Sequence, residues 1–315
     1  TSEDLAGLSG GTYTVTITDA NACTTVETYF GFEPTQLMVS FTQVDVSCNG
    51  LTDGSIDVSV LGGTVPYTYD WNSGTYTTED LSGLAAGTYN LVVTDANSCT
   101  AIATVTIIEP SALGLGGIVV DVSCNGIQDG SIDVSASGGT LPYAYAWNTG
   151  ATSEDLTGQS GGTYTVTLSD GNGCTISSTF VIAEPSALSV ADQITDVVCF
   201  GALNGGIDLT VSGGTLPFTY AWDTGATSED LAGLSGGTYT VTITDANGCT
   251  DVQTYNVFEP TEIAVVPTVS NISCNGFIDG EISLAVSGGQ PPYSYIWSNG
   301  VFVPNQTALL AGTYT

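Results

Sequence analysis

The sequence predicts an all-β protein, a tandem array of immunoglobulin-like antiparallel β-sandwich repeats of about 75 residues each. The intervals between the eight cysteines alternate between 25 and about 50 residues, which marks a repeating unit. Residues 1–21 are identical to residues 227–247. A period of this length indicates stacked structural units rather than one large domain.

Short strand signals recur along the copy that runs from Thr35 to Pro110. The runs that predict strands are Leu37–Val46, Ser55–Val60, Pro66–Trp71, Gly87–Val93 and Cys99–Ile108. The segment Thr77–Leu84, which we call the crossing segment, connects the third and fourth runs, and its Leu81 and Leu84 are candidates for the core. Turn residues separate the runs, and the Asp95–Ser98 segment predicts a hairpin turn, since Asn97 is able to adopt a positive φ. Many short strands with frequent turns are typical of a two-sheet immunoglobulin-type sandwich.

Glu-Pro dipeptides mark the predicted boundaries between copies, because proline fixes φ and removes a hydrogen-bond donor. The predicted segments are the C-terminal part of a repeat at 1–34, immunoglobulin-like repeats at 35–110, 111–185 and 186–260, and the N-terminal part of a repeat at 261–315. The sequence therefore reads as an excerpt of a longer array. No Gly/Ser linker separates the copies, so we expect abutting units of roughly 35 Å each, stacked into a rod.

The charge composition excludes several classes of function. The chain has no Lys, Arg or His and carries 32 acidic residues, for a formal net charge of −32. Nucleic acid binding requires cationic contacts to phosphates, and an anionic membrane surface would repel the chain. Catalysis loses its commonest base and its amine nucleophile, so we expect no enzymatic activity.

Aromatic residues recur at fixed places in each copy and are predicted to form the cores. The third predicted strand ends in tryptophan, and a Gly-x-Tyr follows the crossing segment where immunoglobulin folds place a tyrosine corner. The predicted structural core residues are Trp71, Trp147, Trp222, Trp297, Tyr13, Tyr89, Tyr164 and Tyr239. The alternative is a ligand-stacking platform that includes Tyr67 and Tyr69.

All eight cysteines are predicted to form structural disulfides, which suits an oxidising, extracellular setting. They are Cys23, Cys48, Cys99, Cys124, Cys174, Cys199, Cys249 and Cys274. Two pairings remain open. One joins Cys48 to Cys99 within a repeat and closes a loop worth roughly 4 kcal/mol by chain entropy. In an immunoglobulin topology the loop after the first strand and the loop before the last strand lie at opposite ends of the domain. The other pairing therefore joins neighbouring repeats, Cys48 to Cys174 and Cys124 to Cys249.

No cofactor is expected, and calcium at the junctions is kept as an alternative. The Asp53–Ile56 segment matches the middle of an EF-hand loop, but Leu51 and Val60 would fall at positions that need oxygen ligands. Glu-Asp pairs at 3–4, 79–80, 154–155 and 229–230 give way to Pro304-Asn305 in the last copy. The hairpin aspartates persist in four copies, and turn chemistry accounts for them.

Several spaced motifs together resemble the SprB repeat, a family named after a giant surface adhesin of gliding bacteria. In the copy at 35–110 they are Cys48-Asn49-Gly50, Asp53-Gly54-Ser55-Ile56, Gly62-Gly63, Pro66-Tyr67, Gly87-Thr88-Tyr89 and Asp95-Ala96-Asn97. The resemblance covers the whole chain and implies a secreted cell-surface protein, exported by the type IX system. One copy departs from the pattern, with Cys199-Phe200-Gly201 in place of Cys-Asn-Gly.

The first hypothesis for function is a structural segment, a stalk or filament, of a giant secreted cell-surface adhesin that acts in gliding or surface attachment. Two alternatives are a self-assembling extracellular fibre or sheath and a carbohydrate-binding repeat array. The expected partners are neighbouring repeats of the same chain, with further copies of the chain or surface glycans as alternatives. The expected location is extracellular, at the cell surface.

Overall fold

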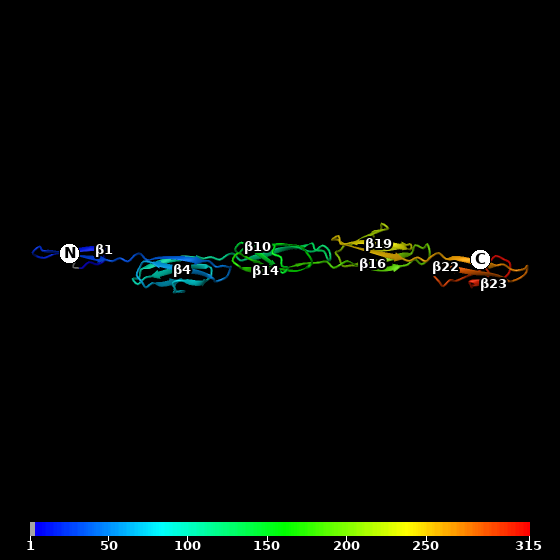
Figure 1. Ribbon diagram of the computed structural model, residues 1–315, viewed down its shortest axis with the longest axis horizontal. Helices are drawn as coiled ribbons and strands as arrows, with labels where there is room; N and C mark the ends of the chain where they lie inside the picture. Colours follow the sequence, from blue (N-terminus) through cyan, green and yellow to red (C-terminus); the bar gives the residue numbers. More distant parts are fainter. Residues whose placement is uncertain (1–3) are drawn as a thin grey trace. The chain divides into compact units, whose positions relative to one another are not determined.

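The computed structural model describes residues 4–315, and every regular element in this range is a β-strand (Figure 1). Contacts divide the chain into two compact units. One comprises the residues up to Ile118 together with Asp133–Leu156 and Tyr164–Phe180, and the other comprises Val119–Ile132, Thr157–Thr163 and Val181–Thr315. Across residues 4–315, the structure contains no helix long and apolar enough to span a membrane.

The strands follow the predicted repeats, with six strands in each of the three central copies. Segment 1–34 contributes β1 (Gly11–Thr18) and β2 (Thr24–Gly31). The copy at 35–110 contains β3 (Met38–Val44), β4 (Gly54–Leu61), β5 (Thr68–Trp71), β6 (Leu81–Leu84), β7 (Gly87–Thr94) and β8 (Thr100–Ile107). The copy at 111–185 contains β9 (Gly114–Val120), β10 (Gly130–Ser137), β11 (Ala144–Trp147), β12 (Leu156–Gln159), β13 (Gly162–Ser169) and β14 (Thr175–Ile182).

The same order continues to the end of the chain. The copy at 186–260 contains β15 (Ser189–Thr195), β16 (Gly205–Ser212), β17 (Thr219–Trp222), β18 (Leu231–Leu234), β19 (Gly237–Thr244) and β20 (Thr250–Val257). Segment 261–315 contributes β21 (Ala264–Ser270), β22 (Gly280–Ser287) and β23 (Asn305–Leu309). The exact repeat boundaries at Glu-Pro stay a prediction, since the strands alone leave the limits of each unit open.

Each six-strand copy forms two antiparallel three-stranded sheets, and in the copies at 35–110 and 186–260 the two sheets share one core. In the copy at 35–110 the sheets run β3–β4–β6 and β5–β7–β8. The chain changes sheet between β4 and β5, between β5 and β6 and between β6 and β7, which gives the two sheets the order of strands A, B, E and C, F, G in an immunoglobulin sandwich. The prediction of an all-β, immunoglobulin-like fold is confirmed. Strand D, which follows strand C in an immunoglobulin fold, is absent here, because the corresponding segment forms the loop before β6.

Alternation along the strands builds each core from both sheets. In β4 the buried residues are Gly54, Ile56 and Val58, with exposed Asp57 between two of them. In the facing sheet, β7 buries Tyr89, Leu91 and Val93. Successive side chains of a strand point to opposite faces, so each sheet contributes one apolar face. These residues form one cluster with Trp71, which is 0% exposed, and with both core candidates of the crossing segment, Leu81 and Leu84.

The copy at 186–260 repeats this packing within the other unit. Ile207 and Leu209 of β16 face Val241 and Ile243 of β19, and Trp222 packs among them. The indole ring of Trp222 also lies against Tyr255 of β20, with ring centroids 6.3 Å apart. Equivalent positions in different copies therefore carry the same structural role.

Two local predictions have different outcomes. The tyrosine corner is confirmed, because the Tyr89 hydroxyl donates a hydrogen bond to the Ala85 carbonyl at 3.0 Å, and Tyr239 makes the same bond to Ser235 at 2.9 Å. The predicted hairpin turn joins β7 and β8, but Asn97, which is able to adopt a positive φ, does not adopt one. Ser98 has a positive φ instead, at 67°, in a turn that the Asp95 carboxylate closes by accepting hydrogen bonds from the N–H groups of Asn97 and Cys99 on either side of it.

Candidate functional site: the disulfide joints between repeats

The loop that follows the first strand of each copy holds a cysteine in a fixed position. We call this the plug loop, residues 47–54 and the equivalent 123–130, 198–205 and 273–280. In the first of these, the Asp53 carboxylate accepts hydrogen bonds from the backbone N–H and the hydroxyl of Ser47. The hydroxyl of Ser47 contributes most to lowering the pKa of Asp53 below its ordinary value. The aspartate thus closes the loop around Cys48 and favours its own charged form.

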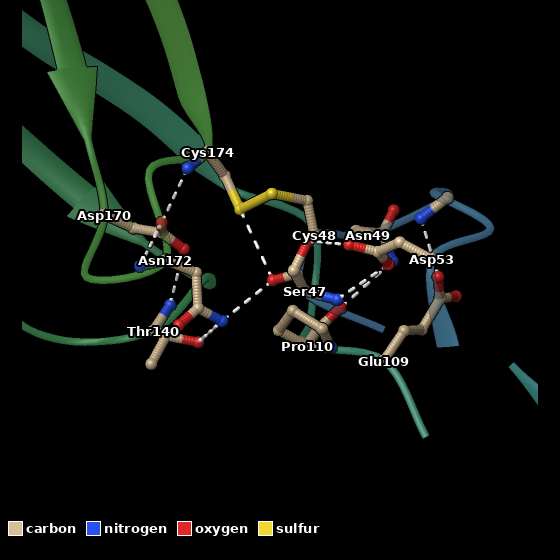
Figure 2. The surroundings of a disulfide bond; sticks show 11 residues. Ser47, Cys48, Asn49, Asp53, Glu109, Pro110, Thr140, Asp170, Asn172 and Cys174 are labelled. Atoms are coloured by element: carbon tan, nitrogen blue, oxygen red, sulfur yellow. Dashed lines mark hydrogen bonds between the residues drawn. A yellow bond between two sulfur atoms is a disulfide. The ribbon is translucent and has the colours of Figure 1, made fainter. Parts of the chain in front are cut away.

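The Glu-Pro junction at the end of a copy fastens the plug loop of that same copy. The Asn49 amide donates to the Pro110 carbonyl at 3.1 Å, and the Gly50 N–H donates to the Glu109 carboxylate at 2.6 Å (Figure 2). Gly50 has a φ of 77°, a conformation that favours glycine. These bonds give the recurring Cys-Asn-Gly and Glu-Pro motifs one shared structural role.

The same fastening occurs in the next two copies. In the copy at 111–185, Asn125 donates to the Pro185 carbonyl at 3.1 Å and Gly126 N–H donates to Glu184 at 2.6 Å. In the divergent copy, Gly201 N–H still donates to Glu259 at 2.6 Å. The change from Asn to Phe200 therefore leaves the glutamate contact in place.

A second element, the hairpin turn between the last two strands, presents the other cysteine. We call it the socket turn, residues 19–23 and the equivalent 95–99, 170–174 and 245–249. In the third of these, Asp170 accepts hydrogen bonds from the N–H groups of Asn172 at 3.0 Å, Cys174 at 2.9 Å and Thr140 at 2.8 Å. Asp170 is therefore a buried carboxylate that ties its own turn to the loop between the second and third strands.

The plug loop of one copy meets the socket turn of the next copy at a disulfide. Cys48 bonds to Cys174, with Cα atoms 5.8 Å apart, and the Asn172 amide donates to the Ser47 carbonyl at 2.8 Å (Figure 2). Both partners lie within the first compact unit. A disulfide that closes a loop of this length contributes about 5 kcal/mol by chain entropy.

The second joint repeats the first within the other unit. Cys124 bonds to Cys249, with Cα atoms 5.7 Å apart, and the Asn247 amide donates to the Ser123 carbonyl at 2.9 Å. Of the two pairings left open by the sequence, the one between neighbouring repeats is formed. The other four cysteines, expected in disulfides, are exposed and unpaired in residues 4–315: Cys23, Cys99, Cys199 and Cys274.

The sequence separation of the two bonded pairs gives a pairing rule that explains the four unpaired cysteines. Each bonded pair joins positions 125 or 126 residues apart. The same offset from Cys23 or Cys99 points before residue 1, and from Cys199 or Cys274 it points beyond residue 315. The expectation for these four fails here because the rule assigns none of them a partner among these residues.

The predicted core aromatic residues are buried where their copy has both sheets and only partly buried where it has one. Buried positions in the three central copies are Trp71, Trp147, Trp222, Tyr89, Tyr164 and Tyr239. Trp297 and Tyr13 are only partly buried, so their placement in a closed core needs correction. Their segments contribute one sheet each, and no second sheet from residues 4–315 covers that face.

The acidic pairs considered for calcium bind protein groups. Asp80 accepts a hydrogen bond from Val58 N–H at 2.9 Å, and Asp155 accepts one from Val134 N–H at 2.8 Å. The Tyr145 hydroxyl donates to Glu154 at 2.8 Å, and burial followed by this bond raises the pKa of Tyr145 to about 12. Glu3 lies outside the described residues. Within the part of the chain that the structure describes, no three His, Cys, Asp or Glu side chains gather as metal ligands.

A pH-dependent effect is expected at the socket turn. Burial raises the pKa of Asp170, but hydrogen bonds from the N–H groups of Thr140 and Cys174 outweigh it and hold the pKa below 3.8. A depressed folded-state pKa gives stability that is present above the unfolded pKa and lost as the pH falls through the folded value. Asp170→Asn should therefore destabilise the chain at pH 7, and its deficit should shrink below a pH of about 4.

Urea unfolding midpoints of the wild type and Asp170→Asn, measured from pH 7 downward, check this expectation. Asp133→Asn removes the same charge from an exposed strand position and serves as the control. A deficit that stays constant across the whole pH range would show that the Asp170 charge has no part in holding the turn.

Comparison with known proteins identifies the repeat. The SprB repeat model matches four times, at residues 40–76, 116–152, 191–227 and 266–302. The chain belongs to the SprB repeat family. Each match begins within the first strand of a copy and includes the plug loop, and the first three matches end just after the third strand. The socket turn of each SprB repeat lies outside the matched segment.

Solved structures similar to this SprB array include chains of consecutive immunoglobulin domains. An eight-domain fragment of Down Syndrome Cell Adhesion Molecule has 10% identity, a TM-score of 0.31, and coverage of 91% of this chain and 56% of its own. Invasin, described as a bacterial integrin-binding protein, has 13% identity, a TM-score of 0.30 and coverage of 83% and 72%. The human desmocollin-1 ectodomain has 14% identity, a TM-score of 0.28 and coverage of 78% and 64%.

These TM-scores are too low to support an argument, so the fold assignment rests on the strand order and packing described above. The curated proteins include no match to the sequence.

Proposed function

We propose that this chain is a structural segment, a stalk or filament, of a giant secreted cell-surface adhesin, in which it extends an adhesive region from the cell. The observation that carries the proposal is that each disulfide joins one repeat to the next. A disulfide within a repeat stabilises that repeat alone, whereas a disulfide between repeats transmits tension from one to the next. Such a joint suits a stalk that holds an adhesive region away from the cell while the chain is under tension.

The chemistry of the joints also supports an extracellular location. Disulfides persist in oxidising compartments and are rare in the reducing cytosol. The absence of Lys and Arg leaves trypsin-like proteases no cleavage site anywhere in the sequence. Export by the type IX system and a role in gliding or attachment follow only from the family, and they belong to the proposal.

A carbohydrate-binding array receives no specific support from the tyrosines considered for it. The Tyr67 hydroxyl donates a hydrogen bond to the Gly62 carbonyl at 2.5 Å, and burial followed by a side-chain hydrogen bond to Glu79 raises the pKa of Tyr69 to about 12. Both rings are partly buried against their own repeat. Both hydroxyl groups thus bond to groups of their own repeat.

Surface labelling of intact cells tests the proposal. Antibodies raised against the 315-residue chain should label cells that produce it, and a protease that cuts after acidic residues should remove the label. Trypsin serves as the matched control, because it should leave this segment intact. Labelling that appears only after permeabilisation would contradict a surface role.

A further inference from the structure

The two disulfides close loops that overlap along the chain. The bond from Cys48 to Cys174 spans Cys124, and the bond from Cys124 to Cys249 spans Cys174. Disulfides within single repeats would instead close separate loops and would leave the junctions between repeats unspanned. Because the observed loops overlap, every peptide bond between Cys48 and Cys249 is spanned by at least one disulfide.

The covalent paths that connect Cys48 to Cys249 have no segment of backbone in common. The bonded cysteines divide the backbone into segments 48–124, 124–174 and 174–249. One path crosses the first disulfide and then needs only the third segment, and another follows the first segment and then crosses the second disulfide. A further path crosses both disulfides and needs only the middle segment. The two ends therefore separate only when all three segments are cut.

We propose that this overlap makes the repeat array tolerant of proteolysis, so that cuts in any one or two of the three segments leave it covalently continuous. Disulfides within single repeats would give less protection, because one cut at a junction would then sever the chain. Disulfides persist in the oxidising compartments where secreted proteins occur. The tolerance follows from the pairing of the cysteines alone, whereas its use in a surface stalk rests on the proposed function.

The glutamates are placed so that one enzyme can test each segment. Glu109 and Glu184 precede proline, and a protease does not cut these bonds because proline lacks the backbone N–H and has a fixed φ. The other glutamates between Cys48 and Cys249 are exposed and lie one in each segment: Glu79, Glu154 and Glu229. A protease specific for glutamate therefore has one cleavable bond in each segment.

A repeat that is cut at one of these glutamates also keeps its two parts packed together. Each glutamate lies in the loop before a short strand, β6, β12 or β18. In the copy at 35–110, Leu81 follows the cut and shares a core with Ile56 and Trp71, which precede it. The Asp80 carboxylate accepts a hydrogen bond from Val58 N–H across the cut. The core thus holds the cut repeat in its folded state, and the disulfides hold it when the core unfolds.

The experiment digests the purified 315-residue chain to completion with a glutamate-specific protease in urea. The chain is purified without reductant, and its free thiols are first blocked with iodoacetamide so that disulfides cannot exchange. Cuts after Glu27 and Glu262, outside the spanned region, release the ends and show that the protease is active. A non-reducing gel should then show two disulfide-linked pairs, residues 28–79 with 155–229 and residues 80–154 with 230–262. Reductant should separate each pair into its two fragments.

A matched pair of variants tests the tolerance itself. Glu154→Gln removes the cleavable bond of the middle segment, so complete digestion should leave residues 28–262 as one covalent species that only reductant separates. The glutamine oxygen can still accept the hydrogen bond that the Tyr145 hydroxyl donates to Glu154. Glu262→Gln removes a cleavable bond outside the spanned region and should still give two separate pairs.

Each alternative gives a different result on the gel. If the wild type kept residues 28–262 as one species after complete digestion, the disulfides would lie within repeats. If it gave separate fragments without reductant, the disulfides would be absent. If Glu154→Gln still fell into two species, one intact segment would not hold the ends together. Any of these results would overturn the proposal, and surface labelling of cells can fail independently because this digestion uses the purified chain.

Discussion

Breaking both disulfides should lengthen the fully stretched chain by about 500 Å, because about 150 residues come under tension only after reduction. In the oxidised chain, tension that reaches Cys48 crosses to Cys174, follows the backbone back to Cys124, and crosses to Cys249. Only residues 124–174 then carry the load between the outermost bonded cysteines. Single-molecule force measurement, with and without reductant, gives this difference directly.

Removing one disulfide gives a sharper test of the pairing. With Cys48→Ser, the Cys124–Cys249 bond still bypasses most of the same residues, so the stretched chain should lengthen by only about 90 Å. The wild type and the variant both keep the four unpaired cysteines, so that either pairing can form before the measurement. A gain of about 175 Å would instead indicate a bond within the repeat, between Cys48 and Cys99. The two pairings thus differ twofold in one measurement.

The second large effect is expected at the core tryptophan of the copy at 186–260. Trp222 is 4% exposed, and its indole N–H donates to the Ser228 carbonyl at 2.9 Å. Trp222→Ala leaves a cavity between the two sheets and an unsatisfied carbonyl, and such changes cost about 3–5 kcal/mol. Hydrogen exchange at β19 should report the loss locally, since a repeat of this size has only about 4–11 kcal/mol of stability.

The last copy supplies the matched control for this substitution. Trp297 makes the same bond, to the Val303 carbonyl at 2.8 Å, but it is partly exposed because no second sheet from the described residues 4–315 covers it. Trp297→Ala should therefore cost less than Trp222→Ala in the single chain. Equal costs at the two positions would contradict the role assigned to the facing sheet.

The sequence predicted strand positions well because local chemistry decides them. Alternation in Ser55–Val60 and the turn residues around it placed β4 (Gly54–Leu61) to within one residue at each end. The tyrosine corner was also predictable, since a tyrosine at that place needs only a nearby backbone carbonyl. The hairpin aspartates were assigned to turns rather than to metal, and Asp170 binds three N–H groups of its own repeat and turn.

The joint was only half visible in the sequence. The cysteines and the asparagines of both loops stood out by recurrence, but Asn172 of the socket turn donates to the Ser47 carbonyl and Asn49 of the plug loop donates to the Pro110 carbonyl, and no side-chain pattern reveals these backbone acceptors. The position of the positive φ, at Ser98 rather than Asn97, was missed for a similar reason. Backbone partners depend on how two loops approach each other in space.

The sequence by itself determined the repeat, the strands, the turn chemistry and the purely negative charge of this chain. These depend on residue type and on contacts between near neighbours. Only the tertiary structure decided that Cys48 bonds to Cys174 and not to Cys99. A disulfide requires Cα atoms about 6 Å apart. Which cysteines meet that condition depends on which ends of two sandwiches face each other, and spacing along the chain does not encode that.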